Sequence, residues 1–184
     1  MTITFNQLNS LTDILPNNRH ILYFPSVLGL QGRDLTLNNT QVTIPTYGTA
    51  HIRVKLLGHS IGFSGGIDFD NSLICSFYER SKGEVLRNLT TWLNASRNME
   101  TGARLPKSQM AANGTLDVIN TIGEAAFSVE LINVFPIQIT WPELAHSSNG
   151  PTEFQTTFNV DGVKYTDGVV SNVKDFLNSN ANYF

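Results

Sequence analysis

The chain has 184 residues, a length that suits one domain with a single continuous core and no need for disulfides. Charged residues make up 15% of it, below the roughly 25% of an average soluble protein. Its polar surface therefore depends on Asn, Ser, Thr and Gln, as suits a protein that contacts other protein. The formal net charge of −3 argues against a general nucleic-acid binder, although a mildly acidic wall would let nucleic acid pass without sticking.

The chain ends and the single cysteine give three further expectations. No basic segment followed by an apolar run opens the sequence, so no signal peptide is predicted, and no apolar run approaches the ~18 residues of a membrane span. Cys75 cannot form an intrachain disulfide and is expected to be a small core residue. Residues 1–18 are polar, and we expect an arm or a frayed helix there.

Alternation of apolar and polar residues predicts strands in the first part of the chain. They are expected at about residues 20–24, 35–37, 42–44, 50–56, 61–63 and 72–78. Pro25 would end the first strand, and Asn38-Asn39 would turn the chain between the second and third. Gly58 would end the fourth, and Gly65-Gly66 would break the fifth. Both faces of residues 72–78 are largely apolar, so this strand should lie in the middle, covered on each side.

After residue 80 the period changes to that of a helix. Ser81 and Glu84 have the spacing of a capping box, in which each side chain binds the other residue's backbone N–H. Apolar residues then recur at helical spacing. One amphipathic helix is therefore predicted at about residues 82–98, packed on the sheet through Val85, Leu89, Trp92 and Leu93.

The second half returns to strands. Residues 100–114 are expected to form a polar loop that contains Arg104 and Lys107. Asp161-Gly162 is typical of a tight hairpin that would return through residues 163–165, and a short helix is expected at about 170–177. Further strands are expected at about residues 116–122, 124–134, 135–144 and 152–160. Strands, one helix and more strands predict a mainly β fold, an antiparallel barrel or sandwich with one flanking helix, as a single domain over residues 1–184.

Candidate chemistry is sparse. Residues 58–62 match G-x-S-x-G, which would make Ser60 a hydrolase nucleophile, but that motif needs a helix directly after it and Gly65-Gly66 disfavours one. Asp68-x-Asp70 begins like a calcium loop, yet Leu73 stands where such a loop needs glycine. The four histidines lack metal-ligand spacing. We therefore expect no catalytic residue, metal or cofactor, and no enzymatic activity.

Three stretches together carry a resemblance to a known family. A strand leads directly into the helix, and a later strand passes through an aromatic-Pro turn and a short polar loop into a final strand. The stretches are Ile61-Gly-Phe-Ser-Gly-Gly-Ile-Asp-Phe-Asp-Asn-Ser-Leu-Ile-Cys-Ser-Phe-Tyr-Glu79 with Gly83-Glu-Val-Leu-Arg-Asn-Leu-Thr-Thr-Trp-Leu93, Val129-Glu-Leu-Ile-Asn-Val-Phe-Pro-Ile-Gln-Ile-Thr-Trp-Pro-Glu-Leu144, and Thr152-Glu-Phe-Gln-Thr-Thr-Phe-Asn-Val160. In element order and turn residues, about residues 20–165 resemble the tail tube proteins of contractile-tailed bacteriophages, the family of the bacteriophage T4 tail tube.

The resemblance implies a structural protein of the virion tail, made in the host bacterial cytoplasm. Six copies would form a ring, and rings would stack into a tube that conducts DNA through its lumen during ejection. The implied partners are other copies of the chain, the tail sheath protein, the tape measure protein and the baseplate hub proteins. Neighbouring copies would complete the exposed sheet edges. Residues near Pro45, Tyr47 and Thr49 would contact the ring above or below.

Three alternatives stay open from the sequence. A baseplate tube initiator and the tube protein of a secretion or toxin-injection system belong to the same structural class. A small serine hydrolase that uses Ser60 belongs to a different class.

Overall fold

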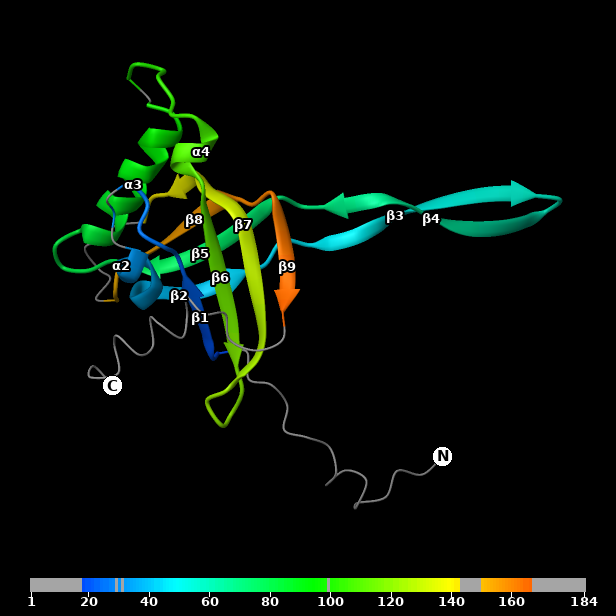
Figure 1. Ribbon diagram of the computed structural model, residues 1–184, viewed down its shortest axis with the longest axis horizontal. Coiled ribbons are helices and arrows are strands. Elements are labelled where there is room, and N and C mark those ends of the chain that lie inside the picture. The colour runs from blue at the N-terminus through cyan, green and yellow to red at the C-terminus, as the bar shows by residue number, and fades with distance from the viewer. Residues whose placement is uncertain (1–17, 29, 31, 99, 143–149, 167–184) are drawn as a thin grey trace.

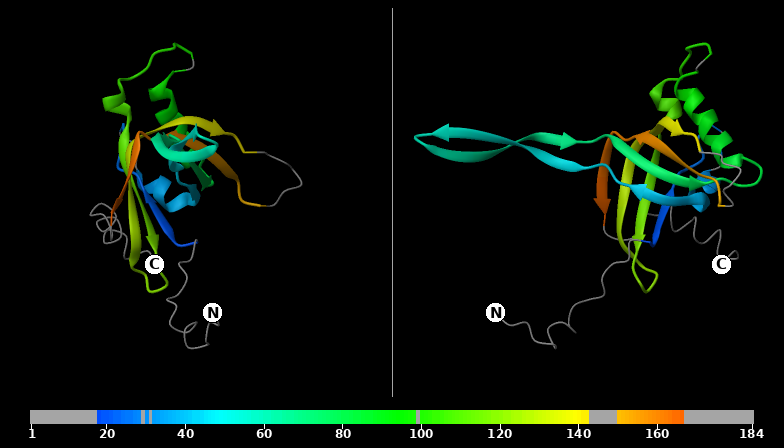
Figure 2. Two further views of the ribbon diagram at one scale, coloured as in Figure 1. Left: turned by 90° about the vertical axis from the view of Figure 1, so that its right-hand side faces the viewer. Right: turned by 180° about the vertical axis from the view of Figure 1, so that it is seen from behind.

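The computed structural model describes residues 18–28, 30, 32–98, 100–142 and 150–166. Within them lies a mainly β body from which one long hairpin projects, as Figures 1 and 2 show. None of the helices among these residues combines the length and the apolar character needed to cross a membrane. The predicted N-terminal arm and the helix predicted at about 170–177 fall outside the described residues.

Seven strands form the sheet of the body, and all of their pairings are antiparallel. Six follow one another in the order β1-β6-β7-β8-β5-β2, and β9 pairs with β7. The long strand β7 joins two parts of the sheet, because its first half pairs with β6 and β9 while its end pairs with β8. The strands are β1 (His20–Tyr23), β2 (Asn39–Thr43), β5 (Ser72–Tyr78), β6 (Ala112–Ile119), β7 (Ala125–Thr140), β8 (Glu153–Asn159) and β9 (Gly162–Thr166).

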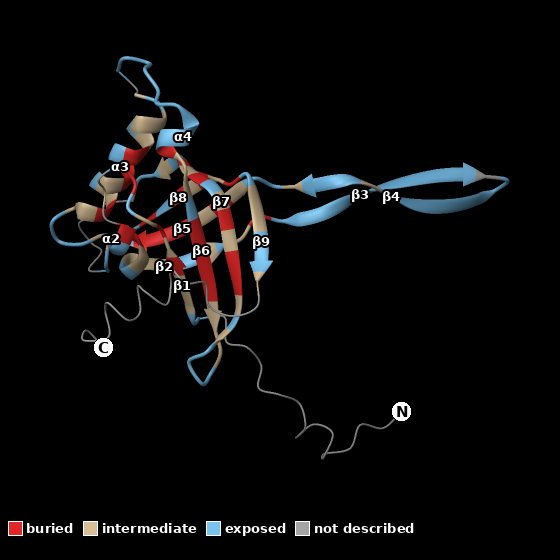
Figure 3. Cartoon of the chain, in the orientation of Figure 1, coloured by how far each residue is buried: buried red, intermediate tan, exposed pale blue. Residues whose placement is uncertain are grey.

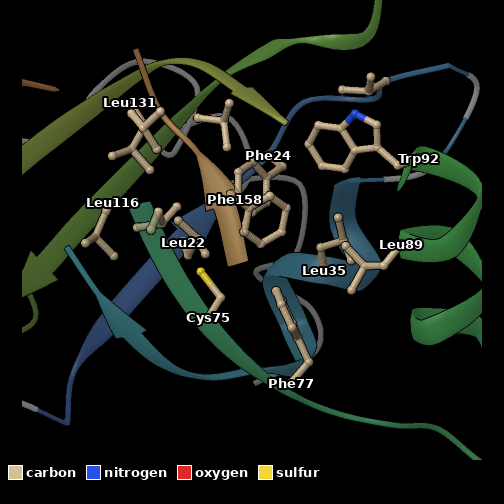
Figure 4. Close-up of a cluster of buried hydrophobic side chains, with 14 of the residues drawn as sticks. Leu22, Phe24, Leu35, Cys75, Phe77, Leu89, Trp92, Leu116, Leu131 and Phe158 are labelled. Carbon is tan, nitrogen blue, oxygen red and sulfur yellow. The ribbon is translucent and has the colours of Figure 1, made fainter. Parts of the chain in front are cut away.

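The core lies between these strands and the helix α3 (Glu84–Ser96), as the close-up in Figure 4 shows. Three aromatic rings meet at its centre: the ring of Phe24 lies 5.8 Å from that of Trp92 and 5.3 Å from that of Phe158, between centroids. The indole N–H of Trp92 donates to the carbonyl oxygen of Met110 at 2.7 Å, so the one polar atom of this large buried side chain is satisfied. The body therefore has a well-packed core of its own.

The predicted fold class is confirmed: the body is mainly β and antiparallel, with α3 beside it. The helix predicted at 82–98 is also confirmed, with ends two residues inside each predicted bound. The predicted strands at 20–24, 72–78 and 152–160 correspond to β1, β5 and β8. The expectation that β5 lies in the middle is confirmed, since β2 and β8 pair with its two edges. Leu73, Cys75 and Phe77 are fully buried on one face; on the other, Ser76 is buried, and Tyr78 at the end of the strand is 43% exposed.

The predicted capping box between Ser81 and Glu84 is wrong. The N-cap residue of α3 is Gly83, in the left-handed conformation at φ 65°, and it has no side chain that could cap the helix. The carboxylate of Glu79 does so from outside the helix, accepting hydrogen bonds from the backbone N–H groups of Val85 (3.1 Å) and Leu86 (2.6 Å). An acidic group at a helix N-terminus is favourable both as an acceptor and through the helix dipole.

Residues 35–37, predicted as a strand, belong to the short helix α2 (Gly32–Asn38). The helix buries Leu35, and the side chains of Thr36 and Asn38 donate to carbonyl oxygens four residues earlier. A second short helix, α4 (Lys107–Met110), interrupts the predicted 100–114 loop, and β6 then begins at Ala112. Leu35 and Leu37, two residues apart, fit the strand period, but in the helix they lie on opposite sides, so Leu35 is buried and Leu37 is exposed.

The hairpin predicted from Asp161-Gly162 is also wrong. β9 follows this turn, but it pairs with residues 128–132 of β7 and not with β8. The backbone N–H of Asp161 donates to the carbonyl oxygen of Ile132 at 3.0 Å, which directs the chain toward β7. The extended segment predicted at 135–144 is continuous with the preceding strand, since β7 runs through Pro136 with a register shift there.

Candidate assembly surface

The projecting hairpin consists of β3 (Tyr47–Leu56) and β4 (His59–Phe69), joined by Leu57 and Gly58. Both linking residues have positive φ, 49° and 82°, as a type I′ turn requires. Among the described residues, β3 and β4 pair only with each other. The hairpin leaves the body between β2 and β5, where the Asp70 N–H donates to the Thr46 carbonyl oxygen at 3.0 Å. The sequence predicted β3 and its end at Gly58, but not that β4 would run on through Gly65-Gly66 to Phe69.

The hairpin is exposed along almost its whole length, as the pale blue of Figure 3 shows. Of the fifteen large apolar residues that are exposed among the described ones, seven lie in the hairpin. They are Tyr47, Ile52, Val54, Leu57, Ile61, Phe63 and Ile67. Leu57 at the tip is 98% exposed and Ile67 is 71% exposed. Exposed apolar residues gathered in one element in this way are typical of an interaction site.

The hairpin and the remainder of the chain carry charges of opposite sign. Residues 47–69 contain Arg53, Lys55 and one acidic residue, Asp68, so they carry +1. With a total of −3, all other residues together carry −4. The charge of the hairpin therefore favours its approach to an acidic protein surface.

The three residues predicted for contacts between rings lie at the base of this hairpin. Tyr47 is 61% exposed, and its ring lies edge-on to that of Phe69 with 6.4 Å between centroids. Thr49 is exposed on the same strand. Pro45 precedes β3 and is buried.

The four residues predicted to pack the helix lie along α3. Val85, Leu89 and Trp92 are buried in the core, and Leu93 is half-buried. The strand that α3 contacts most is β7, and α2 and α4 lie against it as well. The face that α3 turns to solvent forms a shallow groove with Trp141, lined also by Leu86 and Arg87.

Ser60 does not lie in a nucleophile elbow. It is the second residue of β4, exposed and opposite Lys55, and the chain continues as a strand for nine more residues. The hydrolase motif requires a turn that leads into a helix, so the geometry that would activate this hydroxyl is missing here.

The remaining candidates for chemistry are also accounted for by local structure. Asp70 accepts hydrogen bonds from the backbone and hydroxyl of Ser72, where it shapes the entry into β5. Cys75 is fully buried, and burial raises the pKa of its thiol far above the usual value. In the part of the chain that the structure describes, no three His, Cys, Asp or Glu residues cluster as they would around a metal ion.

Lys107, predicted in a solvated loop, is anchored. It forms an ion pair with Asp161 in the turn after β8, and its ammonium lies 5.5 Å from the centre of the Phe135 ring. Asp161 also accepts from the amide of Asn133 at 2.9 Å, and hydrogen bonding by Lys107 lowers the pKa of the Asp161 carboxyl. The ion pair between Lys107 and Asp161 ties α4 to the turn after β8. The position of Lys107 is therefore explained by a structural role.

The exposed apolar side chains of the hairpin are what sequence reasoning missed. The alternation at residues 50–56 predicts a half-buried strand, whereas this segment is exposed over the residues whose side chains are described.

No protein-family model matches the sequence, and no curated protein matches it. Among solved structures, a chain of the extended sheath–tube complex of PVC, an extracellular contractile injection system, is similar with a TM-score of 0.57 and 18% identity, over 90% of this chain and 99% of that one. A chain of the PVC sheath/tube terminator gives 0.64 and 15%, over 85% and 99%. A chain of the tube-terminating cap of the anti-feeding prophage gives 0.60 and 17%, over 86% and 94%. The chain therefore shares its fold with chains of contractile injection systems.

Proposed function

We propose that this protein is a structural subunit of the inner tube of a contractile tail or contractile injection system. The observation that supports this most directly is the likeness of fold over nearly the whole length of both chains, 90% and 99%, with a chain from a sheath–tube complex. In this proposal residues 1–184 form one tube domain. The role is mechanical and not catalytic, which accords with a Ser60 that lacks the surroundings of a nucleophile.

The proposal includes the assembly that the sequence resemblance implies. Six copies form a ring, and rings stack within a sheath around a tape measure protein, beginning at baseplate hub proteins. In a phage, the tube is part of the virion tail and DNA passes through its lumen. Unpaired edges support self-assembly, since β3 and β4 have no other strand beside them among the described residues. Tyr47 and Thr49, at the exposed base of the hairpin, contact the next ring, and buried Pro45 shapes that base.

A second candidate is a terminal ring of the same kind of tube. Two of the compared chains come from a sheath/tube terminator and a tube-terminating cap, and their TM-scores of 0.64 and 0.60 exceed the 0.57 of the sheath–tube complex chain. A terminator caps a tube and does not propagate it, so the two roles differ in whether rings stack.

Negative-stain microscopy of the purified protein over a range of concentrations separates these roles. A tube subunit gives sixfold rings that stack into tubes of indefinite length, whereas a terminator gives single rings that do not stack. A protein that stays a monomer at every concentration would contradict both.

A further inference from the structure

Four strands of the body, β1, β6, β7 and β9, form a layer with two faces. Side chains alternate between the faces, so Leu22, Leu116 and Val129, which are aligned in the register, lie on the face that is buried in the core. The helices that contact these strands, α2 and α3, lie on the same face, since their buried side chains belong to the same core cluster. The left view of Figure 2 likewise shows α2, β2 and β5 to one side of β6, β7 and β9.

The opposite face of this layer, called here the polar face, has a buried centre. One row across it consists of Ile21, Asp117, Ser128 and Thr166, one residue from each strand. Asp117 is 1% exposed and Ser128 is 0% exposed, and Thr115 in the next row is 2% exposed, whereas Ile21 and Thr166 at the ends of the row are only half-buried. Since α2 and α3 lie on the other face, neither of these helices covers the central residues.

Asp117 is the residue of the polar face whose burial is hardest to explain. No donor in the described part of the chain reaches either of its carboxylate oxygens in good hydrogen-bond geometry, and the Thr115 hydroxyl oxygen also has no partner there. Burial raises the pKa of the Asp117 carboxyl, while the Ser128 hydroxyl opposes that rise. An unpaired carboxylate is costly to bury, so whatever covers this face should bring a donor, and preferably a cation.

The chain itself continues from one end of the row that contains Asp117. β9 ends at Thr166, which pairs with Ser128, and residues 167–184 follow. At a strand spacing of about 4.8 Å, Asp117 lies two strands, or about 10 Å, from Thr166. The chain from 167 to Lys174 would span about 12 Å as a helix and about 26 Å if extended. Lys174 can therefore reach the centre of the polar face.

The sequence pattern of residues 170–177, where a short helix is predicted, is complementary to this face. Three apolar residues and one lysine recur there at the spacing of a single helical stripe. They are Val170, Val173, Lys174 and Leu177. The polar face offers the matching groups, since half-buried Ile21 and Tyr23 alternate on β1 beside the carboxylate of Asp117. A lysine within an apolar stripe is what a buried carboxylate beside apolar neighbours requires.

We propose that the polar face of β1, β6, β7 and β9 is a docking site for residues 167–184 of the same chain, with the Lys174 ammonium paired to the Asp117 carboxylate. Charge favours this segment over the other end of the chain. Lys174 is a cation, whereas residues 1–17 contain Asp13 and no Lys, Arg or His, so they would bring like charge to Asp117. The docking is intramolecular and goes beyond the proposed function.

A double-mutant cycle in the full chain tests the pairing. Lys174→Met leaves the Asp117 carboxylate buried without its cation, so we expect about a tenfold loss in the folding equilibrium constant, measured by urea titration. In a chain that already carries Asp117→Asn, the same change should have almost no effect. Lys164→Met, at an exposed lysine of the same face, is the matched control and should change little in either background. Equal effects of Lys174→Met in the two backgrounds would overturn the proposal.

The reactivity of an introduced thiol tests the docking itself. In the full chain, the Thr115→Cys thiol should react with a maleimide at least about tenfold more slowly than the Ile122→Cys thiol, which replaces a residue 82% exposed. Cys75 is fully buried, so the parent gives a low background. Adding Lys174→Glu should release the protection, whereas adding Lys164→Glu should not. Protection that is absent from the start, or that survives Lys174→Glu, would contradict the proposal.

Two further outcomes would identify a different occupant and would also overturn the proposal. Protection that disappears on dilution to the monomer would assign the face to a second copy of the chain. Protection that is lost with Leu11→Asp and not with Lys174→Glu would assign it to residues 1–17. A cooperative thermal transition like the parent's shows that each variant is folded. Neither measurement depends on ring formation, so failure of this inference would leave the proposed function as it stands.

Discussion

Large apolar residues are buried in the body but exposed in the hairpin. In the body, Phe24, Trp92 and Phe158 are at most 1% exposed and pack around one another. In the hairpin, Phe63 is 51% exposed and Ile67 is 71% exposed, on a two-stranded ribbon with no layer against it. An isolated two-stranded hairpin is at best marginally stable in water. The body therefore covers its own core, whereas no other described part of the chain covers the apolar side chains of the hairpin.

Excising the hairpin should have the largest effect and should affect only assembly. Residues 47–69 can be replaced by Asn-Gly, because Thr46 and Asp70 are already joined by a 3.0 Å backbone hydrogen bond. We expect a cooperative thermal transition within a few degrees of the parent's and complete loss of rings in negative stain. A body that no longer unfolds cooperatively would show that the two regions are not separable.

Truncating Trp92 should have the largest effect on the body. Trp92→Ala removes a ring that is 1% exposed, contacts Phe24 and Phe158, and donates to the Met110 carbonyl oxygen. A loss of about 3–5 kcal/mol in the free energy of unfolding is expected from urea titration. Trp141→Ala, at a residue 67% exposed, is the matched control and should cost less than about 1 kcal/mol. Similar losses for both would contradict the described core.

The cap of α3 gives a smaller and more selective effect. Glu79→Ala removes the carboxylate that accepts from the Val85 and Leu86 N–H groups, so unfolding should become easier by about 1 kcal/mol. Ser81→Ala should change almost nothing, since the Ser81 hydroxyl does not cap the helix. Chemical denaturation of the two variants checks this, and a larger loss for Ser81→Ala would restore the capping box predicted from the sequence.

The ion pair between Lys107 and Asp161 should give the smallest effect, with a defined pH dependence. The folded-state pKa of Asp161 is lowered, first by hydrogen bonding from Lys107, so its contribution is present above the ordinary pKa and is lost as pH falls through the lowered one. Both side chains are partly exposed, so Asp161→Asn should cost only about 0.5 kcal/mol at pH 7. The difference from the parent in denaturation should vanish in strong acid; a difference that grows on acidification would contradict the assigned sign.

Local sequence patterns correctly predict those elements of the body whose structure is not decided by contacts with residues distant in the sequence. The stripe of Val85, Leu89 and Trp92 gives α3, and the alternation of Leu73, Cys75 and Phe77 gives β5, because burial of one face sets each period. Contacts distant in sequence decide the rest. Glu79 caps α3 from the end of β5, and β9 pairs with β7 after a turn that locally favours β8.

The candidate surface was harder to predict for a related reason. Alternation reports that one face of a strand is apolar, not whether the chain itself covers that face. Residues 52, 54, 61 and 63 were correctly expected to be extended, but nothing in their own pattern distinguishes a face buried in the body from one left for a partner. The two glycines at 65 and 66 predict a break, whereas they form a bulge inside a continuous strand.

The molar mass of the purified full chain, measured by size-exclusion chromatography with light scattering as concentration increases, tests the central claim most directly. Self-assembly through the hairpin predicts a mass that rises from that of one chain, 20.3 kDa, to that of a six-copy ring and beyond, with sixfold particles in the same fractions. A mass that stays at 20.3 kDa at the highest concentration reached would contradict the account.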